Sequence, residues 1–312
     1  MTDFSALIAK IGKAYAEIAK LEHAAQQGDP DPFLTIQINS IRRMAEQLES
    51  EWQNQAHEEF QEVCFYRVVA DRAKKYSVAP VFRSISTFQS LFSQVFDALV
   101  HEPKERARIS LEVENQTDLK LAYTYPGSFG FALYADSDAS LFEDKFRQTA
   151  AVVADIMKTE DEFHVRDIAS IHGQAVVKRI YDWSRANFES DFGVDLKWHG
   201  IVSDPIKTYS SPALFGNLVD IIEGTVDKSV ASLEVVGILL GMDTQTRRFR
   251  FHAQPSGDDF AGLTDRDFDL SKDWTLNHRY KAKIRATTES RYATLESKVS
   301  YELLSLEEYS RG

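Results

Sequence analysis

Three short segments contain residues of the kinds that bind ATP and metal ions in protein kinases. Residues 127–130 read GSFG, like part of a glycine-rich phosphate loop, and FHVRD and SDFG place Asp167 and Asp191 where a catalytic base and a metal ligand could stand. The spacing does not fit this chemistry. The loop needs a further glycine where the chain has Tyr125, and the asparagine expected five residues after Asp167 is His172. We therefore interpret the segments as structural and expect no ATP site.

The GSFG segment fits a β-hairpin better. Pro126 and Gly127 suit the two central positions of a type II turn. Tyr125 would then end one strand and Phe129 begin the next. Gly130 would let a helix or a partner approach the sheet closely, because it has no side chain.

Asp195 and Lys197 form the pattern D-x-K on a predicted strand, which is similar to the metal-and-lysine half of a nuclease site. The second acid of such a site would have to come from a neighbouring element, and Asp182 or Asp167 could supply it. A solvated strand face explains the pattern equally simply, and that is the interpretation we favour. The catalytic residues, if there are any, stay unknown.

No local pattern of metal ligands is present. The eight histidines never stand three to five residues apart, as zinc ligands often do. Asp265, Asp267 and Asp269 have the spacing of calcium ligands, but the glycine and the final glutamate of such a loop are replaced by Leu270 and Leu276. We expect no metal and no cofactor.

Composition restricts the class of protein. The chain has 312 residues, a net charge of −12 and one cysteine, Cys64, which excludes an intramolecular disulfide. No apolar run approaches the length of a membrane span, and the N-terminal residues do not resemble a secretory signal. We expect a cytoplasmic protein with no membrane partner and no general attraction to nucleic acid.

The elements that would hold these residues fall into three predicted domains of an α+β protein. Residues 1–61 form a coiled-coil-like helical hairpin, 62–230 a mixed α+β domain, and 231–312 a small all-β barrel that is OB-like or SH3-like. In the α+β domain we expect a strand over 109–113, a helix over 82–99 and one long helix over 163–189.

The hairpin carries a heptad seam of apolar residues. Because two helices alone bury little surface, we expect either the main domain or a second chain to cover the seam. We favour self-association, so the chain would be a homo-oligomer. The predicted contact residues of the second helix are Leu34, Ile38, Ile41, Leu48 and Trp52.

The barrel segment carries a candidate basic face. Two predicted strands alternate so that the basic side chains share one side and the apolar ones the other. This face could bind a nucleic acid or an acidic protein partner, or it could simply face solvent. Two facts argue against a nucleic acid: the face has no aromatic residue for base stacking, and the nearby aspartates could neutralise its charge. The basic residues are Arg248, Arg250, Lys281, Lys283 and Arg285.

The GSF-containing strand before a helix, followed by a barrel that begins GxLLGxDTxxRxFxF over residues 237–251, resembles a group of uncharacterised bacterial proteins. Similar small multi-domain proteins occur in bacterial antiviral islands. The resemblance implies a role in antiviral defence and no particular catalytic residue.

Together these observations predict a non-enzymatic interaction and assembly protein. It would self-associate through the hairpin and bind a protein partner through the barrel. The alternative is a nucleic-acid-binding protein or a metal-dependent nuclease that uses the basic barrel face or the Asp195-x-Lys197 strand.

Overall fold

The computed structural model describes residues 4–27, 31–59, 61–71, 77–125, 129–136, 143–200 and 204–309. The chain divides into two compact units, Met1–Thr225 and Val226–Gly312. The predicted helical hairpin and α+β domain therefore belong to one unit, and the predicted boundary at residues 230 and 231 lies inside a strand. The predicted α+β class with an N-terminal helical pair is confirmed. No helix in the described ranges has the length and apolar character needed to cross a bilayer.

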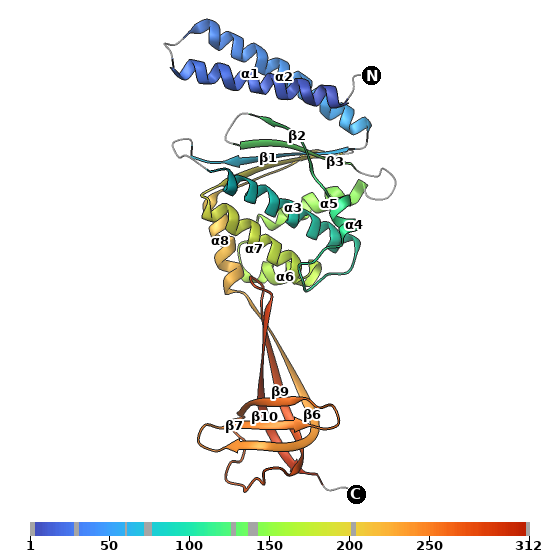
Figure 1. Cartoon of the computed structure of the whole chain (residues 1–312), viewed down its shortest axis with the longest axis vertical. Coiled ribbons are helices and arrows are strands. Elements are labelled where there is room, and N and C mark those ends of the chain that lie inside the picture. Colours follow the sequence, from blue (N-terminus) through green and yellow to red (C-terminus); the bar gives the residue numbers. More distant parts are fainter. Residues whose placement is uncertain are drawn as a thin grey trace. The chain divides into compact units, whose positions relative to one another are not determined.

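Unit 1 has three layers, a helical pair, a sheet and a helical layer (Figure 1). The sheet has the strand order β2-β3-β1-β4-β5, and all its strand pairs are antiparallel. The helical pair packs on one face through β1 and β2, and α3, α5 and α7 pack on the other. The strands are β1 (Gln61–Val69), β2 (Lys120–Tyr125), β3 (Phe129–Asp136), β4 (Gly193–His199) and β5 (Ile206–Ser210).

The helices follow the apolar periodicity of the sequence with two exceptions. Ser110 caps α4, where a strand was predicted, by accepting a hydrogen bond from the backbone N–H of Val113 at 3.3 Å, with Glu112 in the first turn. The long helix predicted over 163–189 breaks at Gly173. The helices of unit 1 are α1 (Phe4–Gln27), α2 (Pro32–Glu58), α3 (Val78–Val100), α4 (Leu111–Gln116), α5 (Glu143–Ile156), α6 (Glu162–His172), α7 (Gln174–Glu189) and α8 (Pro212–Gly224).

Gly173 breaks the long helix for two reasons. Its φ is +90°, a conformation that residues with a side chain rarely adopt. A Cβ atom there would also lie 2.5 Å from the backbone oxygen of Lys104. The approach of another part of the chain, which no local pattern reveals, therefore decides where α6 ends and α7 begins.

Trp52 fixes the helical pair to the sheet. It is fully buried, and its ring lies 5.9 Å from Phe4, 6.2 Å from Phe65 and 5.4 Å from Tyr123. Its indole Nε1 has no hydrogen-bond partner within the described chain. The other face of the sheet holds a buried polar network in which Tyr66 joins Ser84 and Trp183. These contacts make the pair, the sheet and the helical layer one packed body.

Unit 2 is a closed five-stranded barrel with the order β10-β8-β7-β6-β9. The strand β9 returns to pair with β6, which gives the Greek-key order β9-β6-β7-β8. The barrel closes through a parallel pair between β8 and β10. Its strands are β6 (Val226–Asp243), β7 (Arg248–Ala253), β8 (Asp259–Thr264), β9 (Arg279–Arg291) and β10 (Glu296–Glu308).

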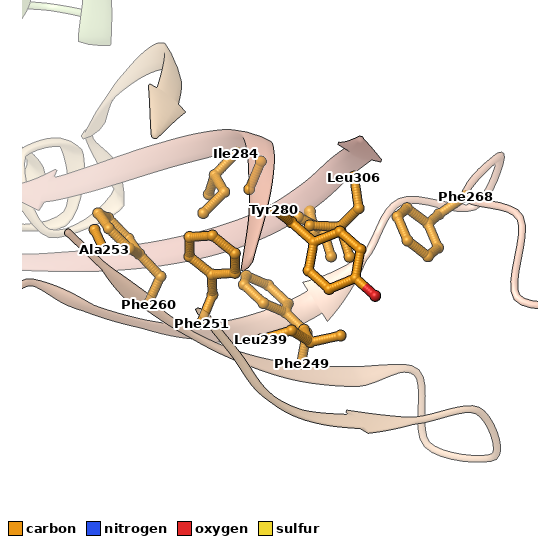
Figure 2. Close-up of a cluster of buried hydrophobic side chains, with 11 residues drawn as sticks. Leu239, Phe249, Phe251, Ala253, Phe260, Phe268, Tyr280, Ile284 and Leu306 are labelled. Carbon is orange, nitrogen blue, oxygen red and sulfur yellow. The ribbon is translucent and has the colours of Figure 1, made fainter. Parts of the chain in front are cut away.

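The barrel core is apolar and rich in aromatic residues. Figure 2 shows Phe249, Phe251, Phe260 and Tyr280 gathered between the strands. Outside the barrel, β6, β9 and β10 continue as a three-stranded ribbon, in which Val226 pairs with Arg291. Most side chains of this ribbon are exposed or half-buried.

Candidate binding sites

A cleft of about 490 Å³ lies in unit 1 between the helical pair and the sheet. Alternation along the strands creates it, since Phe65 and Arg67 of β1 face the helical pair while Cys64 and Tyr66 face the helical layer. In β4 the same alternation brings Asp195, Lys197 and His199 to the cleft side. The lining residues are Tyr15, Glu46, Glu49, Gln53, Phe65, Arg67, Tyr125, Asp195, Lys197, His199 and Lys207.

Gly130 contributes to the cleft through the ring of Tyr125. Tyr125 and Gly130 are direct partners across β2 and β3. A Cβ atom on Gly130 would lie 2.4 Å from this ring. The group that approaches Gly130 is therefore a ring from the neighbouring strand, and not the helix or partner that was predicted. Residues 126–128, the predicted turn, lie outside the described residues. Because Gly130 has no side chain, the Tyr125 ring can lie flat against β3 beside Phe65, at a ring distance of 6.0 Å.

The sheet side of the cleft is basic. Lys197 of β4 and Lys207 of β5 are direct cross-strand partners, and both side chains are exposed. Neither has an ion-pair partner within the described ranges. Their Cβ atoms are about 5 Å apart in such a pair, and like charges placed directly opposite destabilise a sheet. Burial lowers the pKa of the neighbouring His199, and the charges of Lys207 and Lys197 lower it further.

Arg67 and Asp195 form a cross-strand ion pair beside the lysines. The Asp195 carboxylate, the metal ligand of the nuclease interpretation, is therefore paired with a guanidinium in this structure. The two candidate second acids also stand elsewhere. Asp182 belongs to α7, on the opposite face of the sheet, where it pairs with Lys178, and Asp167 lies on α6. Within the described ranges no group of three or more acidic, histidine or cysteine side chains could hold a metal ion.

The helical side of the cleft is acidic. Glu46 and Glu49 lie one turn apart on α2, and the Glu49 carboxylate accepts a hydrogen bond from the Tyr123 hydroxyl at 2.8 Å. Burial raises the pKa of Glu49 above its ordinary value, although the hydrogen bonds from Tyr123 and Tyr15 oppose this effect. The cleft is therefore polarised, with cations on the strands and carboxyl groups on α2.

Sequence reasoning identified Asp195 and Lys197 but missed the rest of this cleft. The strand β5, which carries Lys207, was not predicted. An alternating pattern in residues 206–210, where Lys207 and Tyr209 are exposed while Ser210 is buried, was the available signal. The helical contribution could not be found because nothing in the sequence says which strands α2 covers.

The structure separates the five predicted basic residues of the barrel into two groups. The strands β7 and β9, which were expected to be neighbours, lie on opposite sides of β6. Arg250 pairs with Gly241, whereas Lys281 pairs with Val236. These partners are five residues apart on β6, roughly 16 Å at about 3.3 Å per residue.

Acidic neighbours neutralise most of the β9 group. Lys281 forms an ion pair with Glu234 at 2.9 Å. Arg285 pairs with Asp265 at 3.3 Å and with Glu302 at 2.5 Å. The expected neutralisation by the nearby aspartates therefore occurs at Asp265. Lys283 of β9 has no ion pair within the described chain, and it lies directly opposite Glu234 of β6.

Arg248 and Arg250 keep their charges available on the outer face of β7. Both are exposed, and neither forms an ion pair with a described residue. Hydrogen bonds from Thr246 hold the pKa of Asp243 low, and Arg248 adds to this effect from a longer distance. Across the strand pair, Arg248 faces Leu263, which is 52% exposed. This part of the barrel surface is therefore both basic and apolar.

The predicted contact residues of the hairpin are covered by their own chain. Trp52 and Leu48 pack in the cluster that joins the helical pair to the sheet. Leu34, Ile38 and Ile41 pack against α1. The sheet therefore covers Leu48 and Trp52, whereas α1 covers Leu34, Ile38 and Ile41.

Comparisons of this chain with models of protein families, with curated proteins and with solved structures find no match. The resemblance to a group of bacterial proteins stays a prediction.

Proposed function

We propose that this chain is an interaction protein whose C-terminal barrel recognises a partner through the outer face of β7 and β8. One observation carries the proposal, namely that Arg248 and Arg250 have no ion-pair partner among the described residues and lie beside the exposed Leu263. Arginine next to exposed apolar surface is typical of the residues that dominate protein interfaces.

The barrel topology supports this assignment of the face. Five strands in Greek-key order are what an OB-like barrel would have, and we infer that unit 2 is OB-like rather than SH3-like. In OB-like barrels the second and third strands form the usual ligand face, and here these are β7 and β8.

An acidic protein segment suits the face better than a nucleic acid. The outward side chains of β7 and β8 include Arg248, Arg250, Ala261 and Leu263, and the aromatic residues of these two strands point into the core. Binding of single strands relies on bases stacked on aromatic rings, which this face does not offer. Carboxylates would pair with the arginines, and an apolar side chain would cover Leu263.

The experiment uses the full chain and short fluorescent probes: an acidic peptide that contains leucines, the same peptide without leucines, and single-stranded DNA and RNA. Fluorescence anisotropy is measured over a salt titration for the wild type and for Arg248→Glu with Arg250→Glu. The matched control, Arg291→Glu with Lys298→Glu, makes the same change in net charge at exposed positions of β9 and β10, in the ribbon outside the barrel.

We expect the leucine-containing acidic peptide to bind most tightly and the reversed variant to lose this binding, while the control keeps it. Binding that weakens equally in both double variants would mean that only net charge matters, and the proposal would fail. Tighter binding of DNA or RNA through the same two arginines would replace the acidic partner by nucleic acid.

The second part of the proposal is that the chain self-associates through the helical pair. The surface that supports it is an exposed apolar strip on α2, which is not the seam. Near the start of α2, Phe33, Ile36 and Met44 lie on one face of the helix and are 81%, 65% and 48% exposed. A contact between two chains would use this strip, since the seam residues are already buried.

A further inference from the structure

Two lysines that line the cleft of unit 1 form no ion pair with a described residue, although the charge of Lys197 also acts on Glu49. Lys197 and Lys207 are held directly opposite each other on β4 and β5. The neighbouring pair of Arg67 and Asp195 is internally neutral, so it supplies no counter-charge to the lysines. The register makes the two lysines direct cross-strand neighbours, where like charges repel. An anion bound between their side chains would relieve this repulsion.

The two lysines favour a phosphate monoester over a carboxylate. A phosphate monoester carries a charge of roughly −1.5 to −2 at pH 7, which matches two lysines, and lysine binds phosphate as a point charge. A carboxylate carries a single charge and pairs best with the fork of an arginine. The one arginine of the cleft, Arg67, already makes that pair with Asp195.

The opposite wall limits the size of the ligand. Glu46 and Glu49 lie across the cleft from the strands. They would repel the continuing phosphates of a nucleic acid strand, whereas they can accept hydrogen bonds from hydroxyl or amine groups. The volume of about 490 Å³ is also in the range of small-molecule sites.

We propose that this cleft binds a small phosphate monoester, with its phosphate between Lys197 and Lys207 and its hydroxyl or amine groups facing Glu46 and Glu49. The phenol rings of Tyr15 and Tyr125 and the ring of Phe65 would flank the body of the ligand. His199 stands next to both lysines and is half-buried, so it can donate a further hydrogen bond to the phosphate.

Isothermal titration calorimetry on the full chain tests the site with inorganic phosphate, glycerol 3-phosphate and glucose 6-phosphate. Glycerol and glucose show what the phosphate contributes, and an oligonucleotide with a 5′-terminal phosphate shows whether a polymer can enter. The test variant is Lys197→Gln with Lys207→Gln. The matched control is Lys10→Gln with Lys13→Gln, which removes the same charge from exposed positions on α1 that do not line the cleft.

We expect the two phosphate monoesters to bind and their unphosphorylated parents not to bind. The test variant should weaken the binding at least about tenfold, since a hydrogen bond to a charged group is lost at each lysine. The control should bind like the wild type. Without ligand, the test variant should unfold at the same temperature as the wild type or a higher one, because the like-charge contact is gone.

The proposal is overturned if neither monoester binds the wild type at millimolar concentration, or if the control loses as much affinity as the test variant. It is also overturned if the phosphorylated oligonucleotide binds more tightly than the monoesters. Glu46→Gln sharpens this last comparison. It should reduce the discrimination against the oligonucleotide, because it removes one negative charge from the wall that excludes the polymer.

Discussion

Replacing Trp52 by alanine tests whether the helical pair is packed on the sheet as strongly as the structure indicates. The side chain is fully buried between α1, α2, β1 and β2. A tryptophan buries roughly 150–250 Å², which is about 4–6 kcal/mol at 25 cal/mol per Å². The indole Nε1 is buried without a partner in the described chain, and removing it returns roughly 1–3 kcal/mol. We therefore expect a net loss of about 3 kcal/mol in the free energy of unfolding.

Trp52→Phe separates the two contributions. Phenylalanine keeps most of the ring contacts with Phe4, Phe65 and Tyr123 and removes the unpartnered N–H. The smaller ring and the lost N–H act in opposite directions, so the free energy of unfolding should change by about 1 kcal/mol or less. Phe82→Ala on the exposed face of α3 is the control and should cost about 0.5 kcal/mol or less.

Urea unfolding followed by the helical circular dichroism signal measures these effects, because all described helices belong to unit 1. A loss of less than about 1 kcal/mol in Trp52→Ala would mean that the helical pair is not held by this contact. An equal loss in Trp52→Phe and Trp52→Ala would refute the assignment of an unsatisfied N–H, since the indole nitrogen would then be making a favourable interaction.

Three further predictions concern other parts of unit 1. Gly173→Ala should destabilise the chain by at least about 1–3 kcal/mol in the same urea experiment, because φ is +90° and Lys104 lies against the missing Cβ; an unchanged midpoint would contradict this. The pKa of Glu49 is raised in the folded state. Its contribution to the free energy of unfolding is therefore fully present below pH 4.5, the ordinary pKa, and is lost as the pH rises through the raised pKa of the folded state. Glu49→Gln should therefore gain stability relative to the wild type as the pH rises from 4 to 8 in a series of thermal unfolding curves, and a constant difference would argue against a raised pKa. Phe33→Ser with Ile36→Ser should shift any oligomer toward monomer in light scattering without lowering the unfolding temperature, and an oligomer unaffected by this change would rule out the α2 strip as its contact.

The sequence by itself determined most of the local structure. The apolar period of the two N-terminal helices placed α1 and α2, with Asp31 as an N-cap before Pro32. Aromatic and β-branched residues placed β1, and alternation placed β4 and most of the barrel strands. These features depend on residues that are close along the chain, so a short window contains the information needed to predict them.

Two local predictions were wrong, the first because a local capping signal was missed and the second because of a contact outside such a window. Residues 109–113 alternate like a strand, but the Ser110 cap and an acidic first turn form α4 instead. The period of the helix predicted over 163–189 continues through Gly173, and only the approach of Lys104 requires the break there.

Tertiary structure alone decided which charges remain available. The basic residues of β7 and β9 look like one face in the sequence, but β6 lies between them, and ion pairs with Glu234, Asp265 and Glu302 neutralise Lys281 and Arg285. Lys197 and Lys207 are ten residues apart and no sequence pattern links them, yet the register of β4 and β5 sets them directly opposite each other. The physical reason is that the packing of a whole sheet fixes its strand order and register. The charge of a surface then depends on which side chains this packing brings close together, and these side chains can be far apart in the sequence.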